Sequence, residues 1–147
     1  MIIRLSALFV ALSISLWLQG CCQSQHIEPS YPNEVTGWKD FKNGSTKLRG
    51  SFVLKKAERT DNGKLEIRVL DLMPTECTGD AGNYAERARV RLEFRRVSDQ
   101  RLLCSETFPE NGGGSVGISE EFGVFGVSVR AINLKDGWVF FILDGDY

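Results

Sequence analysis

The sequence predicts an all-β fold, an antiparallel β-sandwich of immunoglobulin-like or similar kind, with a small β-barrel as the alternative. Three observations predict it. Apolar residues alternate with polar ones at a period of two in several short stretches, turn sequences rich in glycine, asparagine and aspartate separate these stretches, and no helical period appears after residue 45. The pattern indicates six or seven strands and three hairpins.

The first strand pair is predicted on either side of a tight turn. In 46–55, every second position carries an apolar residue or glycine: Leu48, Gly50, Phe52 and Leu54. The turn Asp61-Asn62-Gly63 tolerates the positive φ angles of a short hairpin. In the return run 64–72, Leu65, Ile67 and Val69 share one face, and the later leucines fall out of phase, which predicts a β-bulge or a strand covered on both faces. We expect these two runs to pair as the first hairpin.

The segment 86–97 requires a choice between helix and strand, because alanine, glutamate, arginine and leucine favour helices. On a helix, with about 100° per residue, its apolar residues would split between two opposite faces. On a strand they share one face: Ala88, Val90, Leu92 and Phe94. The strand is therefore preferred. Ser98-Asp99-Gln100 supplies the turn, and 101–108 returns as the partner strand.

The glycine-rich stretch 109–117 is predicted to be a loop, because Gly112-Gly113-Gly114 permits almost any backbone path. Strands over 122–134 and 138–143 follow, joined by the turn Lys135-Asp136-Gly137. The last strand consists entirely of apolar residues. Such a short apolar run indicates a central strand that is covered on both faces.

The first 20 residues have the pattern of an export signal. Arg4 gives a positive start, 5–18 are almost wholly apolar, and the run ends at Leu18-Gln19-Gly20-Cys21. About 14 apolar residues are too few for a membrane-spanning helix, which needs roughly 20. The sequence Leu-x-Gly-Cys resembles the lipobox of bacterial lipoproteins. This resemblance implies that Cys21 is lipidated and becomes the first mature residue, and an ordinary secreted or uncleaved chain is the alternative.

The predicted organisation is a signal peptide at 1–20, a lipidated N-terminus and tether at 21–45, and a single β-domain at 46–147. The tether is rich in glutamine, serine, proline, asparagine and glycine and shows no apolar period. Its residues Trp38 and Phe41 are expected to dock the start of the domain against the core.

Cys77 and Cys104 are expected to form a disulfide bond, because disulfides persist in exported domains. The bridge would close a loop of about 28 residues and contribute roughly 3 to 4 kcal/mol through loop-closure entropy. The alternatives are two buried free thiols or a zinc pair, although two cysteines this far apart, without a histidine nearby, have poor zinc-ligand spacing.

Charge and residue inventory favour a binding protein over an enzyme. Residues 21–147 carry 17 basic and 19 acidic side chains, a formal net charge of −2, so no nucleic-acid partner is indicated. The single histidine, His26, lies in the predicted tether and is poorly placed to activate a nucleophile. Glu120 and Glu121 would point to opposite faces of a strand and would not converge as a glycosidase pair. The run 112–117 lacks the Lys-Ser/Thr ending of a phosphate loop. No cofactor is expected.

The outward face of the predicted 86–97 strand carries a row of like charges, the arginine stripe: Arg87, Arg89, Arg91 and Arg95. Such charges repel one another unless acids on neighbouring strands or an outside anion offset them. The internal candidates are Glu66, Asp71 and Glu106. The external candidate is an acidic protein or an envelope polyanion, because the planar arginine fork holds carboxylate or phosphate at two points.

Asp136, Asp144 and Asp146 are candidate calcium ligands, because loop aspartates at one end of a sandwich supply the oxygens that calcium needs, although turn formation explains the same residues. Taken together, the sequence predicts a lipid-anchored protein of the bacterial cell envelope, held at the membrane and facing the periplasm or the exterior. Its β-domain is expected to bind a partner and to have no catalysis of its own. The alternatives are a small envelope hydrolase that uses carboxylates and a calcium-stabilised structural module.

Overall fold

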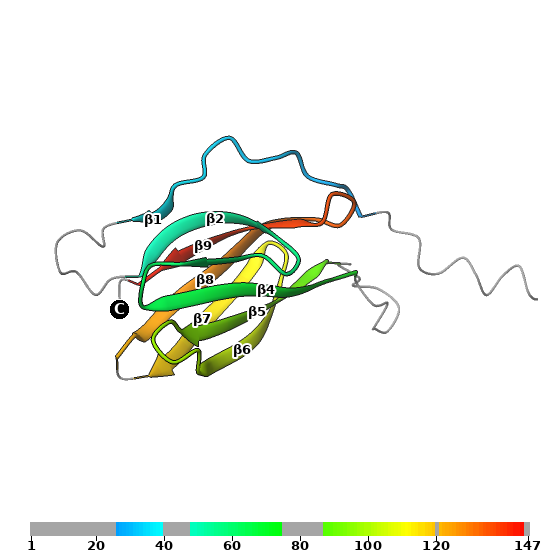
Figure 1. The fold of residues 1–147 in the computed structure, drawn as a ribbon. Helices are drawn as coiled ribbons and strands as arrows, with labels where there is room; N and C mark the ends of the chain where they lie inside the picture. The colour runs from blue at the N-terminus through cyan, green and yellow to red at the C-terminus, as the bar shows by residue number, and fades with distance from the viewer. Residues whose placement is uncertain (1–25, 40–47, 75–86, 120, 146–147) are drawn as a thin grey trace, which may run out of the picture.

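The computed structural model describes residues 26–39, 48–74, 87–119 and 121–145. They form two antiparallel sheets (Figure 1) and include no helix long and apolar enough to cross a membrane. The first sheet has the order β1 (Gly37–Lys39), β2 (Arg49–Lys55), β9 (Trp138–Asp144), β8 (Gly123–Asn133) and β7 (Gly112–Ser119). The second has the order β3 (Arg59–Asp61), β4 (Leu65–Met73), β5 (Arg89–Arg96) and β6 (Leu102–Pro109). The predicted all-β sandwich is confirmed, and the sheets do not close into a barrel.

The core lies between the two sheets and is built from the alternating apolar positions of the strands. None of the following inward residues is more than 2% exposed: Ile67, Val69, Leu92, Phe94, Phe125, Val127, Val129 and Phe141. The rings of Phe94 on β5 and Phe125 on β8 meet edge to face, with centroids 5.5 Å apart, and so join the two sheets.

Two of the three predicted hairpins are confirmed. Strand β5 pairs with β6, and β8 pairs with β9, both antiparallel. Their turns require positive φ angles, which Gln100 (58°) and Gly137 (72°) adopt. The β-bulge predicted in 64–72 is also present, as a register shift between Val69 and Asp71 on β4.

The predicted first hairpin is wrong, because β2 and β4 lie in different sheets. Strand β2 pairs with β1 and β9, whereas the turn Asp61-Asn62-Gly63 joins β4 to the short strand β3. The chain leaves the first sheet just after β2, where Ala57 has a φ of 69° and donates its amide to the carbonyl of Val69. The turn at 61–63 is therefore where the sequence predicts it. The strand that it joins to β4 is β3, whereas the sequence predicted the strand over 46–55.

The predicted loop at 109–117 is also wrong, since most of it belongs to strand β7, which pairs with β8. Glycine is depleted in strands, but it is required where two backbones approach closely. A Cβ on Gly113 would lie only 2.1 Å from the carbonyl oxygen of Val127, so this position on the β7–β8 ladder excludes a side chain.

Part of the segment assigned to the tether lies along the first sheet. Strand β1 pairs with the start of β2, and the Trp38 ring packs on Phe52 with centroids 4.8 Å apart. The Trp38 indole also donates a hydrogen bond of 3.0 Å to Thr60 Oγ1 on β3, so it ties the two sheets together at one edge. Phe41, the second predicted docking residue, lies outside the described residues.

Candidate functional site

Residues 26–36, here called the N-terminal strap, cross the outer face of the five-stranded sheet before β1 (Figure 1). The strap begins at His26, whose Nε2 donates to the carbonyl oxygen of Ile132 at 2.9 Å. Its Nδ1 lies 3.6 Å from a carboxylate oxygen of Glu110. The Glu28 carboxylate accepts a 2.8 Å hydrogen bond from the amide of Leu134. The sequence places His26 in a tether, whereas the structure fixes it to the end of β8.

The strap is also fixed along its length and at its far end. The Tyr31 ring meets Trp138 of β9 edge to face, with centroids 5.5 Å apart. Thr36 and Ser51 exchange hydrogen bonds, from the Thr36 amide to Ser51 Oγ (2.9 Å) and from the Ser51 amide to Thr36 Oγ1 (3.1 Å). Because both ends are anchored, the middle of the strap stands as a side wall over the sheet.

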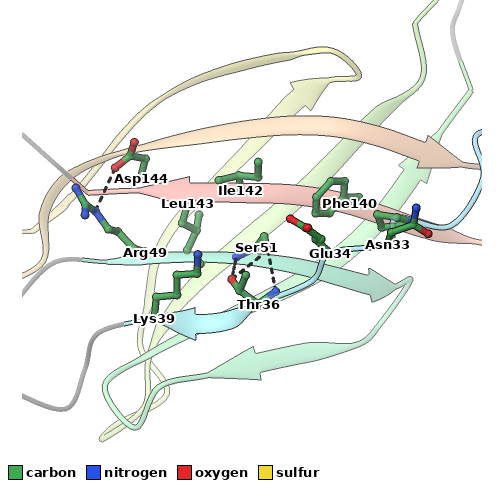
Figure 2. A pocket seen from close by; sticks show the side chains of 12 residues that line it. Asn33, Glu34, Thr36, Lys39, Arg49, Ser51, Phe140, Ile142, Leu143 and Asp144 are labelled. Carbon is green, nitrogen blue, oxygen red and sulfur yellow. Dashed lines mark hydrogen bonds and ion pairs between the residues drawn. The ribbon is translucent and has the colours of Figure 1, made fainter.

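An open groove of about 830 Å³, here called the strap groove, lies between this wall and the sheet (Figure 2). Its floor includes Phe140 and Ile142, the half-buried outward residues of the central strand β9. The rest of its lining is mostly polar: Pro32, Asn33, Glu34, Thr36, Lys39, Arg49, Gly50, Ser51, Leu143 and Asp144. An apolar floor with a few placed polar groups is the usual composition of a ligand site.

The outer face stays hollow beyond the strap groove. A second depression of about 410 Å³ shares Ile142 and Asp144 with it and extends over β8 and β7. Its lining includes five residues with no side chain or a small one: Gly113, Gly114, Ser115, Gly126 and Ser128. Arg130 adds a positive charge at its border. The two depressions together form a continuous recessed surface across the five-stranded sheet.

The charges in the strap groove include one ion pair, between Arg49 Nε and Asp144 Oδ1 at 3.5 Å (Figure 2). The candidate calcium ligands do not gather here. Asp136 accepts a hydrogen bond from Asn133 within the β8–β9 turn. It lies at the opposite end of β9 from Asp144, roughly 25 Å away by strand rise. Asp146 lies outside the described residues, among which no cluster of three metal-ligating side chains occurs.

The arginine stripe lies on the outer face of the four-stranded sheet, away from the strap groove. Arg89, Arg91 and Arg95 alternate along β5 with buried apolar residues, and Arg87 is exposed just before the strand. Arg95 Nε lies 3.1 Å from a Glu93 carboxylate oxygen. Arg91 Nε donates to Ser105 Oγ at 3.2 Å.

The acids of β4 that the sequence offered as partners of the stripe form their ion pairs with other basic residues, although they stand opposite stripe arginines in the register. Glu66 is 3% exposed, stands opposite Arg95 in the register, and pairs at 3.4 and 3.1 Å with Arg59 and Arg68. Asp71 stands opposite Arg91, but its carboxylate pairs with Lys56 at 2.7 Å. The hydrogen bond from Lys56 holds the Asp71 pKa below its ordinary value. The outer face of the four-stranded sheet therefore carries charges of both signs and is not uniformly positive.

The remaining sites from the sequence are only partly described. Cys104 carries a free, half-buried thiol, and burial, followed by the nearby Glu106 charge, raises its pKa. No disulfide is seen in the described part of the chain, and Cys77, the predicted partner of Cys104, lies outside it, as does Cys21. Glu121 pairs with Arg96 Nε at 3.3 Å, whereas Glu120 lies outside the described residues.

Sequence reasoning missed the strap groove, although one signal pointed to it. The apolar run 138–143 predicted a central strand covered on both faces, and β9 is central, with the strap over its outer face. Nothing in the strap sequence itself indicated which surface it would cover. Comparison of the chain with protein-family models, curated proteins and solved structures finds no match. The geometry of the site therefore carries the functional argument.

Proposed function

We propose that the chain is a lipid-anchored protein of the bacterial cell envelope, whose β-sandwich binds a partner in the strap groove without catalysis of its own. The observation that carries the proposal is a groove with a fixed side wall, an apolar floor and a polar rim. The walls are held by the hydrogen bonds of His26, Glu28 and Thr36, so little conformational freedom is lost when a partner enters.

The described residues of the groove fit the binding of a partner better than they fit the alternative, hydrolysis by two carboxylates. Its two described carboxylates come from different walls, Glu34 from the strap and Asp144 from β9, and Asp144 is engaged by Arg49. The imidazole of His26 is bound to the Ile132 carbonyl at the end of β8. A hydrolase needs an acid and a base that converge on one reacting bond, and the groove instead presents Phe140 and Ile142 at its floor.

The anchor half of the proposal rests on Leu18-Gln19-Gly20-Cys21. Four residues, 22–25, separate Cys21 from the fixed His26, and the five steps from one Cα atom to the other span at most about 18 Å. Lipidation at Cys21 would therefore keep the domain close to the bilayer. Replacing Cys21 with alanine is expected to release the full chain from membranes and to abolish labelling with a fatty-acid analogue. A Cys21→Ala chain that still partitions with membranes contradicts the anchor.

The groove half is tested by photo-crosslinking in intact cells. A photoreactive residue at Glu34, which lines the groove, is expected to give a discrete adduct. The same residue at the neighbouring Val35, which is 43% exposed and outside the groove, is the matched control. A third position, Arg89, tests the arginine stripe as the binding surface for an acidic protein or polyanion. Adducts at Arg89 or Val35 with none at Glu34 would move the partner away from the groove.

Catalysis has its own test. The purified chain is incubated with peptide, ester and glycan substrates of the envelope, alongside Glu34→Gln and Asp144→Asn variants. We expect no turnover that either substitution abolishes. An activity that disappears in one variant, while the far-ultraviolet circular dichroism is unchanged, establishes the hydrolase alternative.

The proposal also includes a Cys77–Cys104 disulfide in the exported protein, for the sequence reasons given above. Cys104 lies on β6, and partial burial would protect a bridge there from reductants. Alkylation under denaturing, non-reducing conditions is expected to leave both cysteines unlabelled. Labelling of both excludes the bridge.

A further inference from the structure

The two sheets have four edge strands, and three of them carry features that block strand addition. Strands β1 and β3 are only three residues long. Strand β6 is longer, but it contains Glu106 and ends at Pro109. Short strands, charges and prolines are the devices by which proteins protect sheet edges from pairing with other chains.

Strand β7 is not protected by its length, by charge or by proline, and its one register irregularity with β8 lies at its end, between Gly117 and Ser119. It is eight residues long, contains neither a charged residue nor a proline, and pairs only with β8 among the described strands. Gly113, Gly114, Ser115 and Gly117 are exposed, so the backbone is accessible along much of the strand. An accessible edge of this length presents unpaired amides and carbonyls to a further strand.

The side-chain order of β7 indicates which strand fits. Val116 is buried and Ile118 is partly buried against the core, so the even-numbered positions face inward. Gly114 shares this face, because a Cβ there would contact the Phe108 ring at 3.5 Å. The strand is therefore small in its first half and bulky in its second half on the same face.

In an antiparallel pair of two β7 strands centred on Ser115, the small half of each strand lies opposite the bulky half of the other. Val116 of each copy would stand opposite Gly114 of the other, and Ile118 opposite Gly112. On the outward face the two Ser115 side chains would meet at the twofold axis, where hydroxyls can form a cross-strand hydrogen bond. No residue of β7 is charged, so no like charges meet between the two β7 strands themselves.

We infer that the free edge of β7 is a homodimer interface, which joins two five-stranded sheets into one continuous sheet through antiparallel β7–β7 pairing. The inference is independent of the partner proposed for the strap groove. It requires only that two copies meet, and a shared membrane anchor would raise their local concentration.

The test is sedimentation of the full chain in detergent micelles over a range of protein concentrations. The wild-type chain is expected to dimerise reversibly. Ser115→Lys places two ammonium groups at the twofold axis and is expected to raise the dimer dissociation constant at least about tenfold. Thr107→Lys, an exposed site on β6, is the matched control and is expected to leave dimerisation unchanged.

Cysteine crosslinking provides a second measurement that does not depend on destabilisation. Ser115→Cys is expected to form an oxidised dimer above the wild-type background, because residues directly opposite on antiparallel strands lie within disulfide reach. Thr107→Cys is expected not to do so. A wild-type chain that stays monomeric overturns the inference, as does a dimer that Thr107→Lys disrupts and Ser115→Lys does not. A monomer in which Ser115→Lys instead abolishes capture of another protein assigns the edge to a different partner.

Discussion

The edge-to-face contact between Phe94 and Phe125 offers a direct test of how the two sheets face each other. Both rings are fully buried, their centroids are 5.5 Å apart and their planes are inclined by 64°. Strand β5 supplies one ring and β8 the other, and these strands belong to different sheets. An energetic coupling between the two side chains therefore reports on sheet-to-sheet packing.

Leucine is the appropriate replacement for each ring. A Phe→Ala change in a core costs about 3 to 5 kcal/mol, a large share of the 5 to 15 kcal/mol that stabilises a typical domain. Phe94→Leu and Phe125→Leu are each expected to lower the free energy of unfolding by about 1 to 2 kcal/mol. Either change removes the aromatic pair, so the double variant is expected to lose about 0.5 to 1.5 kcal/mol less than the sum of the two singles.

The assay is urea unfolding of the wild type, the two single variants and the double variant, followed by circular dichroism and tryptophan fluorescence. A control cycle joins Phe94→Leu with Phe52→Leu, because no ring contact links these two residues in the described part of the chain. That cycle is expected to be additive within about 0.5 kcal/mol. Additivity of Phe94 with Phe125, together with coupling in the control, would refute the packing described here.

Three further predictions concern single interactions. Lys56→Gln is expected to raise the Asp71 pKa toward 3.8, because the Lys56 hydrogen bond is the main cause of its depression; a carboxyl NMR titration measures this. Since the folded pKa is the lower one, the stability gained from this pair is present at neutral pH and is lost as the pH falls through the folded value. Glu106→Gln is expected to lower the Cys104 pKa and speed its alkylation in the reduced protein at fixed pH. Asn133→Ala removes hydrogen bonds to the strap and to the β8–β9 turn and is expected to cost about 1 to 3 kcal/mol in urea unfolding.

The elements that could be predicted from the sequence are those whose partners are close in the chain. The β5–β6 and β8–β9 hairpins join strands through short turns. The alternation of apolar residues and the turn residues are therefore enough to predict which strands pair. The alternating pattern also gave the correct inward residues of β5, including Phe94, and placed the arginine stripe on the other face.

The errors arose where pairing is not local. Strand β2 and the later strand β4 both show period-two alternation. This pattern indicates which face of a strand is buried, but it does not indicate which strand it pairs with. Strand β2 pairs with β1 and with β9, which lies near the other end of the chain. Strand β7 was missed for a different reason, since its glycines match a loop composition. What makes them strand residues is the close approach of β8, and that contact exists only in the folded domain.

The candidate site also depends on contacts between residues that are far apart in the sequence. His26 and Ile132, whose hydrogen bond holds the strap, are 106 positions apart. Both ends of the chain contribute to one sheet, so the segment that follows the proposed anchor also forms a wall of the groove on β9. The proposed anchoring and the proposed binding would therefore share one structural element. In a chain anchored at Cys21, tension on the strap would act first on the hydrogen bonds of His26 and Glu28 and next on the contacts of Pro29 and Tyr31 with Asn133 and Trp138. It would reach the Thr36–Ser51 contact beside the groove only after these. This order would protect the groove wall from movements of the proposed anchor, because the contacts of 26–31 must open before the wall itself is displaced.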